Sequence, residues 1–262
     1  MPRKNKAGLE EIRGFFATMM AVASGSTDPR FERAFELVRR EAFVGPGPWH
    51  INIYQRTVET PSADPVFLYQ NVLVRLDAAK GINNGEPFLH AAWMGAVEPK
   101  PGEAVCHIGA GTGYYTAILS VLTLPGGVVH AYEIDEGLAN KARDNLRPFE
   151  GVSVIQGDAT RLPLPPSDLI YVNAGVVTPP LSWLKALRPQ GPPDFPMAAV
   201  ASDGPCDHRH ARYCRFQRQA ADGVVFHSLR RTDGSRAMRK DPRQWRGMVG
   251  AVLVVEHRPG SR

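Results

Sequence analysis

A glycine-rich turn between an apolar run and a helix-like run is the strongest chemical signal in the sequence. In AVCHIGAGTGYYTAIL (Ala104–Leu119), the apolar residues are followed by Gly109, Gly111 and Gly113. A strand that ends in such a turn and opens a helix presents backbone N–H groups to a ligand, and glycine permits its close approach. Tyr114 stands where a dinucleotide motif has its third glycine, which disfavours NAD and FAD. No Gly-Lys-Ser/Thr follows, which excludes a P-loop.

Two carboxylates follow at the ends of later predicted strands. Glu133 ends the strand in VVHAYEID, where an acidic side chain can accept hydrogen bonds from both ribose hydroxyls. Asp158 in VIQGDAT follows the third strand, where it can accept from an adenine amino group, and Ala159 supplies a backbone N–H. The alternative is that both carboxylates are solvated caps. The three signals, in this order and spacing, resemble class I S-adenosylmethionine-dependent methyltransferases.

The elements around these residues alternate between short apolar strands and helices. We predict strands at 104–108, 127–134, 152–156 and 169–173, and helices at 114–122, 136–146 and 180–186. This alternation is typical of a parallel sheet covered on both faces. The fold class is therefore α/β, a doubly wound Rossmann-like sheet.

A helical N-terminal extension precedes this sheet. We predict helices at 9–23, 28–43 and 87–97, with a short strand at 51–54 in a loop rich in proline and glycine. Residues 67–77 are strand-like or irregular. We expect an extension with its loop at 1–60, a cofactor-binding core at 61–190 and an atypical basic segment at 191–262.

A narrower resemblance rests on five segments. They are AFELVRREAFVGP, YQNVLVRLDAAKGINNGEPFLHAAWM, HIGAGTGYYTAIL, SDLIYVNAG and PPLSWLKALRPQG, and together they resemble the protein-L-isoaspartate O-methyltransferase family over roughly Phe31 to Gly191. The resemblance implies methylation of the free carboxylate of an isoaspartyl residue by S-adenosylmethionine, a repair of damaged protein. A carboxylate is already ionised near pH 7, so we expect positioning and exclusion of water, without a triad or a metal.

The resemblance assigns residues to two sites. Those assigned to the substrate loop, as catalytic candidates, are Asn83, Asn84 and Gly85. Those assigned to the cofactor are His107, Gly109, Ala110, Gly111, Gly113, Glu133, Asp158, Ala159 and Asn173, the last being a candidate for the substrate side as well.

Two positions depart from the family pattern. Aligned on Pro87, Gly85 stands where the family has serine, and Asn83 and Asn84 could supply polar contacts instead. His107 replaces an acidic residue that commonly holds the methionine amino group; it either bonds the methionine portion or is a packed histidine. These departures leave open another acceptor, such as a peptide natural product or small molecule, or a disabled cofactor-binding relic.

The net charge of +5 is concentrated in the last quarter of the chain. Residues 1–190 carry a net charge of −1 and residues 191–262 a net charge of +6. The basic residues are dispersed among few aromatics, which disfavours nucleic acid as a partner. No apolar run approaches the roughly 20 residues of a membrane span, and FFATMMAVA (Phe15–Ala23) is short for a signal peptide. We expect a cytoplasmic monomer that acts on a protein or peptide carboxylate.

The last segment lacks the strand patterns of the family. Codons read one base later permit AIIVT from 206–210 and FIP from 226–228, in the family's order. We hypothesise that 191–262 is frameshifted or poorly ordered, although Gly247–Glu256 could still pair as a strand. The spacing of Cys206, His208, His210 and Cys214 matches no common zinc module, and three cysteines argue against a disulfide framework.

Overall fold

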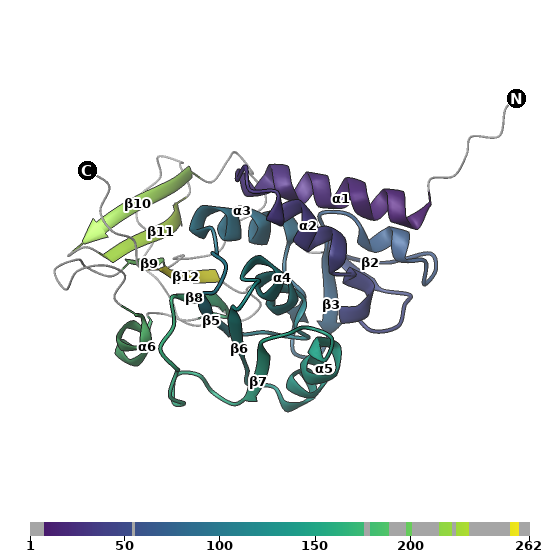
Figure 1. Ribbon diagram of the computed structural model, residues 1–262. Helices are drawn as coiled ribbons and strands as arrows, with labels where there is room; N and C mark the ends of the chain where they lie inside the picture. The colour runs from purple at the N-terminus through teal and green to yellow at the C-terminus, as the bar shows by residue number, and fades with distance from the viewer. Residues whose placement is uncertain are drawn as a thin grey trace, which may run out of the picture.

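A six-stranded sheet forms the centre of the structure (Figure 1). The computed structural model describes residues 8–53, 56–175, 179–188, 198–200, 215–221, 224–230 and 252–256. The strand order is β7-β6-β5-β8-β12-β9. The parallel strands are β5 (Ala104–Ile108), β6 (Val128–Glu133), β7 (Val152–Gln156) and β8 (Leu169–Asn173). The predicted parallel sheet is confirmed.

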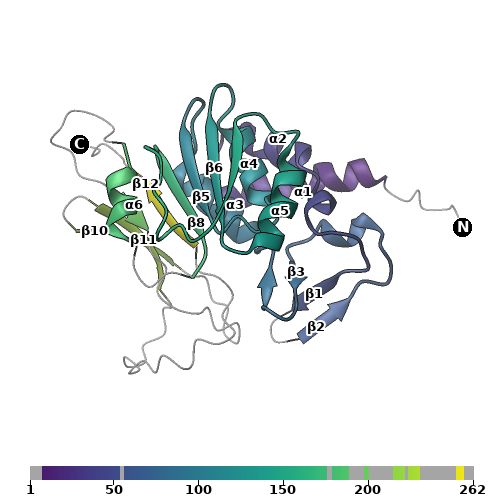
Figure 2. The same cartoon turned by 90° about the horizontal axis from the view of Figure 1, so that it is seen from below.

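Helices cover both faces of this sheet (Figure 2). On one face lie α1 (Leu9–Ser24), α2 (Arg30–Leu37), α3 (Pro87–Val97), α4 (Tyr114–Leu122) and α5 (Glu136–Leu146), and on the other α6 (Leu181–Ala186). Successive residues of a strand face opposite ways, so Val105 packs in the first core and Cys106 packs in the second with Trp183. The doubly wound fold class follows from this arrangement.

The second helix of the N-terminal extension differs from the sequence prediction. The helix predicted at 28–43 is interrupted after α2, where Val38 is extended (φ −86°, ψ 101°), and resumes as a 3₁₀ turn, η1 (Arg40–Phe43). The interruption brings the Arg40 guanidinium, fully buried, to the carbonyl oxygens of Leu68 (2.5 Å), Gln70 (2.9 Å) and Val72 (2.5 Å). Buried carbonyls need donors, and this tertiary demand overrides the helical pattern.

A small antiparallel sheet links the extension to the core. Its strands are β1 (His50–Ile53), β2 (Arg56–Glu59), β3 (Leu73–Asp77) and β4 (Ile82–Asn83), in the order β2-β1-β3-β4, with a 3₁₀ turn η2 (Pro65–Leu68) before β3. The strand predicted at 51–54 corresponds to β1, whereas β2 was not predicted. Every residue of β2 is exposed, so it has no apolar alternation. The boundary predicted at residue 60 lies within this sheet, because β1 pairs with β3.

Four described strands lie in the basic C-terminal segment. β12 (Val252–Glu256) pairs antiparallel with β8 and with β9 (Ala198–Val200), and β10 (Arg215–Ala221) and β11 (Val224–Arg230) form a hairpin. The strand predicted within Gly247–Glu256 is thus found, and the other three were not predicted. The cluster Cys206–Cys214 lies outside the described residues, and the reading-frame hypothesis stays a prediction.

The described part of the chain contains no helix of the length and apolarity needed to span a bilayer.

Substitution of Arg40 tests the importance of its buried hydrogen bonds. Arg40→Leu should lower the free energy of unfolding by about 3 kcal/mol, because three buried carbonyl groups each lose a donor at about 1 kcal/mol or more. The neighbouring Arg39 is exposed, so Arg39→Leu should change the free energy of unfolding by less than about 0.5 kcal/mol. Urea-induced unfolding measures both, and equal effects would contradict this account.

Candidate active site

The glycine turn after β5 has a backbone that only glycine adopts easily. Gly109, Gly111 and Gly113 have φ values of +77°, +58° and +97°. A Cβ at Gly109 would lie 2.4 Å from the carbonyl oxygen of Asn173, and one at Gly113 would lie 2.7 Å from a methyl group of Leu146. The first glycine therefore lets the turn reach the end of β8, and the third lets α4 begin against α5.

Glu133, predicted to bind the ribose hydroxyls, lies against this turn. Its side chain is buried at the end of β6, where Oε2 accepts from the N–H of Gly111 (2.7 Å) and Oε1 from that of Asp135 (3.0 Å). Burial raises the pKa of Glu133, and the backbone donors oppose that shift. Each carboxylate oxygen keeps a further lone pair for a hydroxyl donor.

Asp158 follows the next strand at the same edge of the sheet. The N–H of Gly157 donates to the carbonyl of Glu133 (2.9 Å), which joins the two strand ends. Asp158 Oδ1 accepts from the Thr160 hydroxyl (2.7 Å) and N–H (2.9 Å), and these bonds lower the pKa of Asp158. Its Oδ2 has the guanidinium of Arg161 at 3.4 Å on the solvent side.

Ala159 and Ala110 are small residues beside these carboxylates, and both are buried. The carbonyl of Ala159 accepts from the indole N–H of Trp183 (2.9 Å), which fixes this loop on α6. The N–H of Ala110 donates to the carbonyl of Tyr132 (3.1 Å). The structure therefore brings the turn, Glu133 and the loop of Asp158 to one edge of the sheet.

His107 lies beneath the turn, inside the core. Its Nδ1 is 2.8 Å from the Thr116 hydroxyl, its ring packs edge-on against Tyr171, and its Nε2 has no partner among the described residues. Burial lowers the pKa of His107 to about 3. This geometry favours the packed histidine of the two alternatives; a bond to a methionine portion stays untested.

The substrate loop is fixed by its own asparagines. Asn84 is buried, and its Oδ1 accepts from the N–H of Val74 (2.9 Å) and from Arg40 (3.4 Å). Asn83 Oδ1 accepts from the N–H of Gly85 (2.9 Å). Oδ1 of Asn84 thus holds the loop against β3, where the buried backbone needs an acceptor, whereas Nδ2 of Asn84 has no partner among the described residues. The contact of Asn84 with substrate stays a prediction.

Sequence reasoning missed a buried aromatic cluster below the substrate loop. The ring of His90 stacks on Tyr115, with centroids 3.5 Å apart, and its Nδ1 lies 2.7 Å from the hydroxyl of Tyr171. The three residues come from α3, α4 and β8, so no local spacing connects them. In the sequence, His90 lies within the apolar run FLHAAWM, and this pattern indicates only that His90 occupies a core position.

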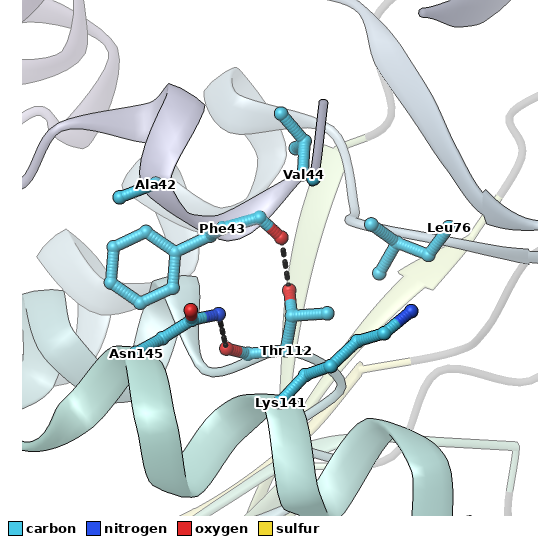
Figure 3. Close-up of a pocket in the computed structure, with 8 residues that line it drawn as sticks. Ala42, Phe43, Val44, Leu76, Thr112, Lys141 and Asn145 are labelled. Atoms are coloured by element: carbon cyan, nitrogen blue, oxygen red, sulfur yellow. Dashed lines mark hydrogen bonds between the residues drawn. The ribbon is translucent and has the colours of Figure 1, made fainter. Parts of the chain in front are cut away.

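A pocket lies on the outer side of the glycine turn (Figure 3). Thr112 donates its hydroxyl to the carbonyl of Phe43 (2.6 Å) and accepts from the amide of Asn145 (2.9 Å). Lys141 extends across the pocket below Leu76, as Figure 3 shows. The extension and α5 thus hold the turn from outside.

The β3–β4 hairpin also reaches the loop that carries Glu133. Lys80, in the turn of that hairpin, forms ion pairs with Asp135, the N-cap of α5, and with Asp77 (3.5 Å). An ion pair therefore connects the hairpin turn that precedes the substrate loop to the start of α5, two residues after Glu133.

Within the described residues, no group of three or more His, Cys, Asp or Glu side chains is arranged to hold a metal ion.

Comparison with known proteins decides the family. The model of the family described as protein-L-isoaspartate(D-aspartate) O-methyltransferase matches residues 24–199. The chain belongs to this family. The match spans η1, the substrate loop, the glycine turn and the strand ends with Glu133 and Asp158.

Individual family members match different shares of the chain. The protein-L-isoaspartate O-methyltransferase of Methanopyrus kandleri is 36% identical over 121 residues, which is 44% of this chain and 54% of that protein. A solved protein-L-isoaspartate O-methyltransferase matches with a TM-score of 0.57 and 25% identity over 72% of this chain and 54% of that one. The chain spans about half the length of these two proteins.

A further solved structure supports the fold. It is described as a beta-aspartate methyltransferase of this type from Plasmodium falciparum in complex with S-adenosyl-L-homocysteine. Its TM-score is 0.52 at 17% identity, over 68% of this chain and 81% of that one.

Substitution of Gly109 separates contact from backbone strain. Gly109→Ala should lower the free energy of unfolding by about 3 kcal/mol or more, because φ alone costs about 1 to 2 kcal/mol and the Cβ would collide with the Asn173 carbonyl. Gly102 has φ +82° and no atom nearer than 4.0 Å to a Cβ, so Gly102→Ala should cost only about 1 to 2 kcal/mol. Thermal and urea unfolding compare the two, and equal losses would contradict the packing role.

Buried His107 predicts a loss of stability in acid. The pKa of His107 is about 3 in the folded state against an ordinary 6.5, so the unfolded state binds the proton first. Stability is intact above pH 6.5 and falls by about 1.4 kcal/mol per pH unit below it. At pH 5 this amounts to about 2 kcal/mol.

Urea unfolding between pH 7.5 and 5 measures this slope. His107→Gln should reduce the slope by about 1.4 kcal/mol per pH unit and leave the part that comes from His90, whose pKa is also lowered by burial. His50→Gln, at an exposed position on β1, should retain the whole slope. An unchanged slope in His107→Gln would show that His107 is not the group that titrates.

Proposed function

We propose that this chain transfers a methyl group from S-adenosylmethionine to the free carboxylate of an isoaspartyl residue in a protein or peptide. The observation that carries the proposal is the junction of three strand ends, where the glycine turn, the buried Glu133 and the loop of Asp158 meet. Family membership of residues 24–199 supports the acceptor class.

The residues at this junction fit S-adenosylmethionine. A Cβ at Gly109 would collide with the carbonyl of Asn173 at the end of β8, so the turn requires glycine there. Glu133 is buried and keeps one lone pair on each carboxylate oxygen, which suits two ribose hydroxyls. Among the described residues, Asp158 Oδ2 has no partner closer than 3.4 Å, so it can accept from an adenine amino group. When bound, the cofactor supplies a methyl group on a positively charged sulfur.

The chain itself has little proton chemistry to perform. The acceptor carboxylate is ionised at neutral pH, so no general base is needed. The residues have to bind the two reactants, align the carboxylate oxygen with the methyl group and exclude water. The buried His90, Tyr115 and Tyr171 under the substrate loop provide a rigid, largely water-free floor.

A second acceptor class is favoured by one observation. A side chain at Gly85 would collide with His90, so the serine of the family's loop has no room at this position. A peptide natural product or a small carboxylic acid is the alternative acceptor. A cytoplasmic location, a monomeric state and exclusion of nucleic acid stay predictions, as does the disabled relic that the unusual C-terminal segment suggests.

Methyl transfer from labelled S-adenosylmethionine tests the proposal. An isoaspartyl peptide should acquire base-labile label, and its aspartyl twin should not. Label in neither peptide, with S-adenosylhomocysteine binding intact, would contradict the acceptor. No binding of S-adenosylhomocysteine in calorimetry would contradict the cofactor and favour the relic.

Substitution of Glu133 tests the cofactor site itself. Glu133→Ala should weaken S-adenosylhomocysteine binding by about 10- to 100-fold, because charged hydrogen bonds contribute about 1.5 to 3 kcal/mol. Glu136 is an exposed acidic residue on α5, and Glu136→Ala should stay within about twofold. Equal Kd values for wild type and Glu133→Ala would remove Glu133 from the site.

A further inference from the structure

Gly85 has no room for a side chain, and a histidine nitrogen stands in its place. Gly85 is buried with φ +78°, and an ideal Cβ there would lie 2.3 Å from Nε2 of His90 and 2.9 Å from Cε2 of Tyr115. Such a Cβ would therefore meet the polar edge of an imidazole. The Gly85 position of the loop therefore lies directly against Nε2 of His90.

His90 is held in one orientation by two contacts. Its ring is stacked on Tyr115 at an interplanar angle of 9°, and its Nδ1 is 2.7 Å from the Tyr171 hydroxyl. The side chain is 1% exposed, and Nδ1 is its one bonded nitrogen among the described residues. Nε2 lies against the loop at Gly85, and none of the hydrogen bonds between described residues involves it.

The contact with Tyr171 is compatible with two tautomers of His90, and the chemistry of the phenol favours the one with the proton on Nε2. Burial lowers the pKa of His90 well below its ordinary value, with the charges of His107 and Arg40 acting the same way, so the ring is neutral. Burial raises the pKa of Tyr171 well above its ordinary value, so the phenol keeps its hydrogen. The acceptor it meets among the described residues is Nδ1 of His90, and a neutral imidazole that accepts at Nδ1 carries its hydrogen on Nε2.

We infer that the Nε2–H of His90 is the side-chain donor that binds and orients the substrate carboxylate at the Gly85 position of the loop. This inference rests on the proposed function and assigns the specificity of that site to a residue of α3 instead of the loop. A carboxylate offers only acceptors, so a neutral N–H suits it and can be buried without the cost of an unpaired charge. Tyr171 and Tyr115 act as positioning residues for the imidazole.

A double-mutant cycle between residues 85 and 90 tests the inference. His90→Ala should lower kcat/KM for an isoaspartyl peptide by about 10- to 100-fold, mainly through KM, with S-adenosylhomocysteine affinity within about twofold. Gly85→Ser alone should be as impaired, because its Cβ collides with the imidazole. Gly85→Ser/His90→Ala should lose no more activity than Gly85→Ser alone, because both changes remove the same donor from the substrate, while φ +78° and Tyr115 still strain a serine at residue 85.

The outcomes separate this inference from the proposed function. Additive losses in the double variant, or an unchanged KM in His90→Ala, overturn the inference while the function stands. Absence of label with the wild-type chain overturns both. If His90→Ala fails to fold, His90→Phe replaces it, because phenylalanine keeps an aromatic ring on Tyr115 but has no N–H donor. His90→Phe should show the same rise in KM for the peptide.

A spectroscopic signature gives an independent readout. In ¹⁵N-histidine-labelled protein, the His90 ring should show a protonated Nε2, and that signal should shift when isoaspartyl peptide is added to the complex with S-adenosylhomocysteine. The aspartyl twin serves as the control and should leave the signal in place. A hydrogen on Nδ1, or an Nε2 signal that ignores the isoaspartyl peptide, overturns the inference.

Discussion

The buried guanidinium of Arg40 holds together the parts of the molecule that form the site. Its donors meet the carbonyls of residues 68–72 and the amide oxygen of Asn84, so one side chain connects η1, the segment before β3 and the substrate loop. Burial lowers the pKa of this arginine, which records the cost of taking its charge out of water. Carbonyl dipoles offset that cost, since no carboxylate lies among its described partners.

The same turn that carries Arg40 also supports the cofactor side. The carbonyl of Phe43 accepts from Thr112 inside the glycine turn, and Asn145 of α5 holds the other side of Thr112. The N-terminal extension is therefore part of the site and not an appendage to it. The two predicted units, extension and core, share one hydrophobic cluster that includes Phe16, Phe35 and Tyr114.

The floor of the site is built from polar aromatic residues that have few partners. His90, His107, Tyr115 and Tyr171 are all buried, and the hydroxyl of Tyr115 and Nε2 of His107 are unpartnered among the described residues. Buried polar groups that lack hydrogen-bond partners destabilise a core. These groups lie under the glycine turn and the substrate loop, where bound polar reactants would supply the missing hydrogen-bond partners.

The sequence by itself determined the elements that depend on local pattern. The bounds of α3, α4, α5, β5, β7 and β8 agree with the prediction, because apolar periodicity and flanking glycine or proline act within a few residues. The meeting of Glu133 with the glycine turn was also predictable, since neighbouring parallel strands end at one edge. Only the tertiary structure decided the break before Arg40, the inward turn of Asn84, the pairing of β12 with β8, and the encounter of Gly85 with His90 and Tyr115. Those features depend on which buried donors and acceptors meet across distant segments, and no local spacing records that.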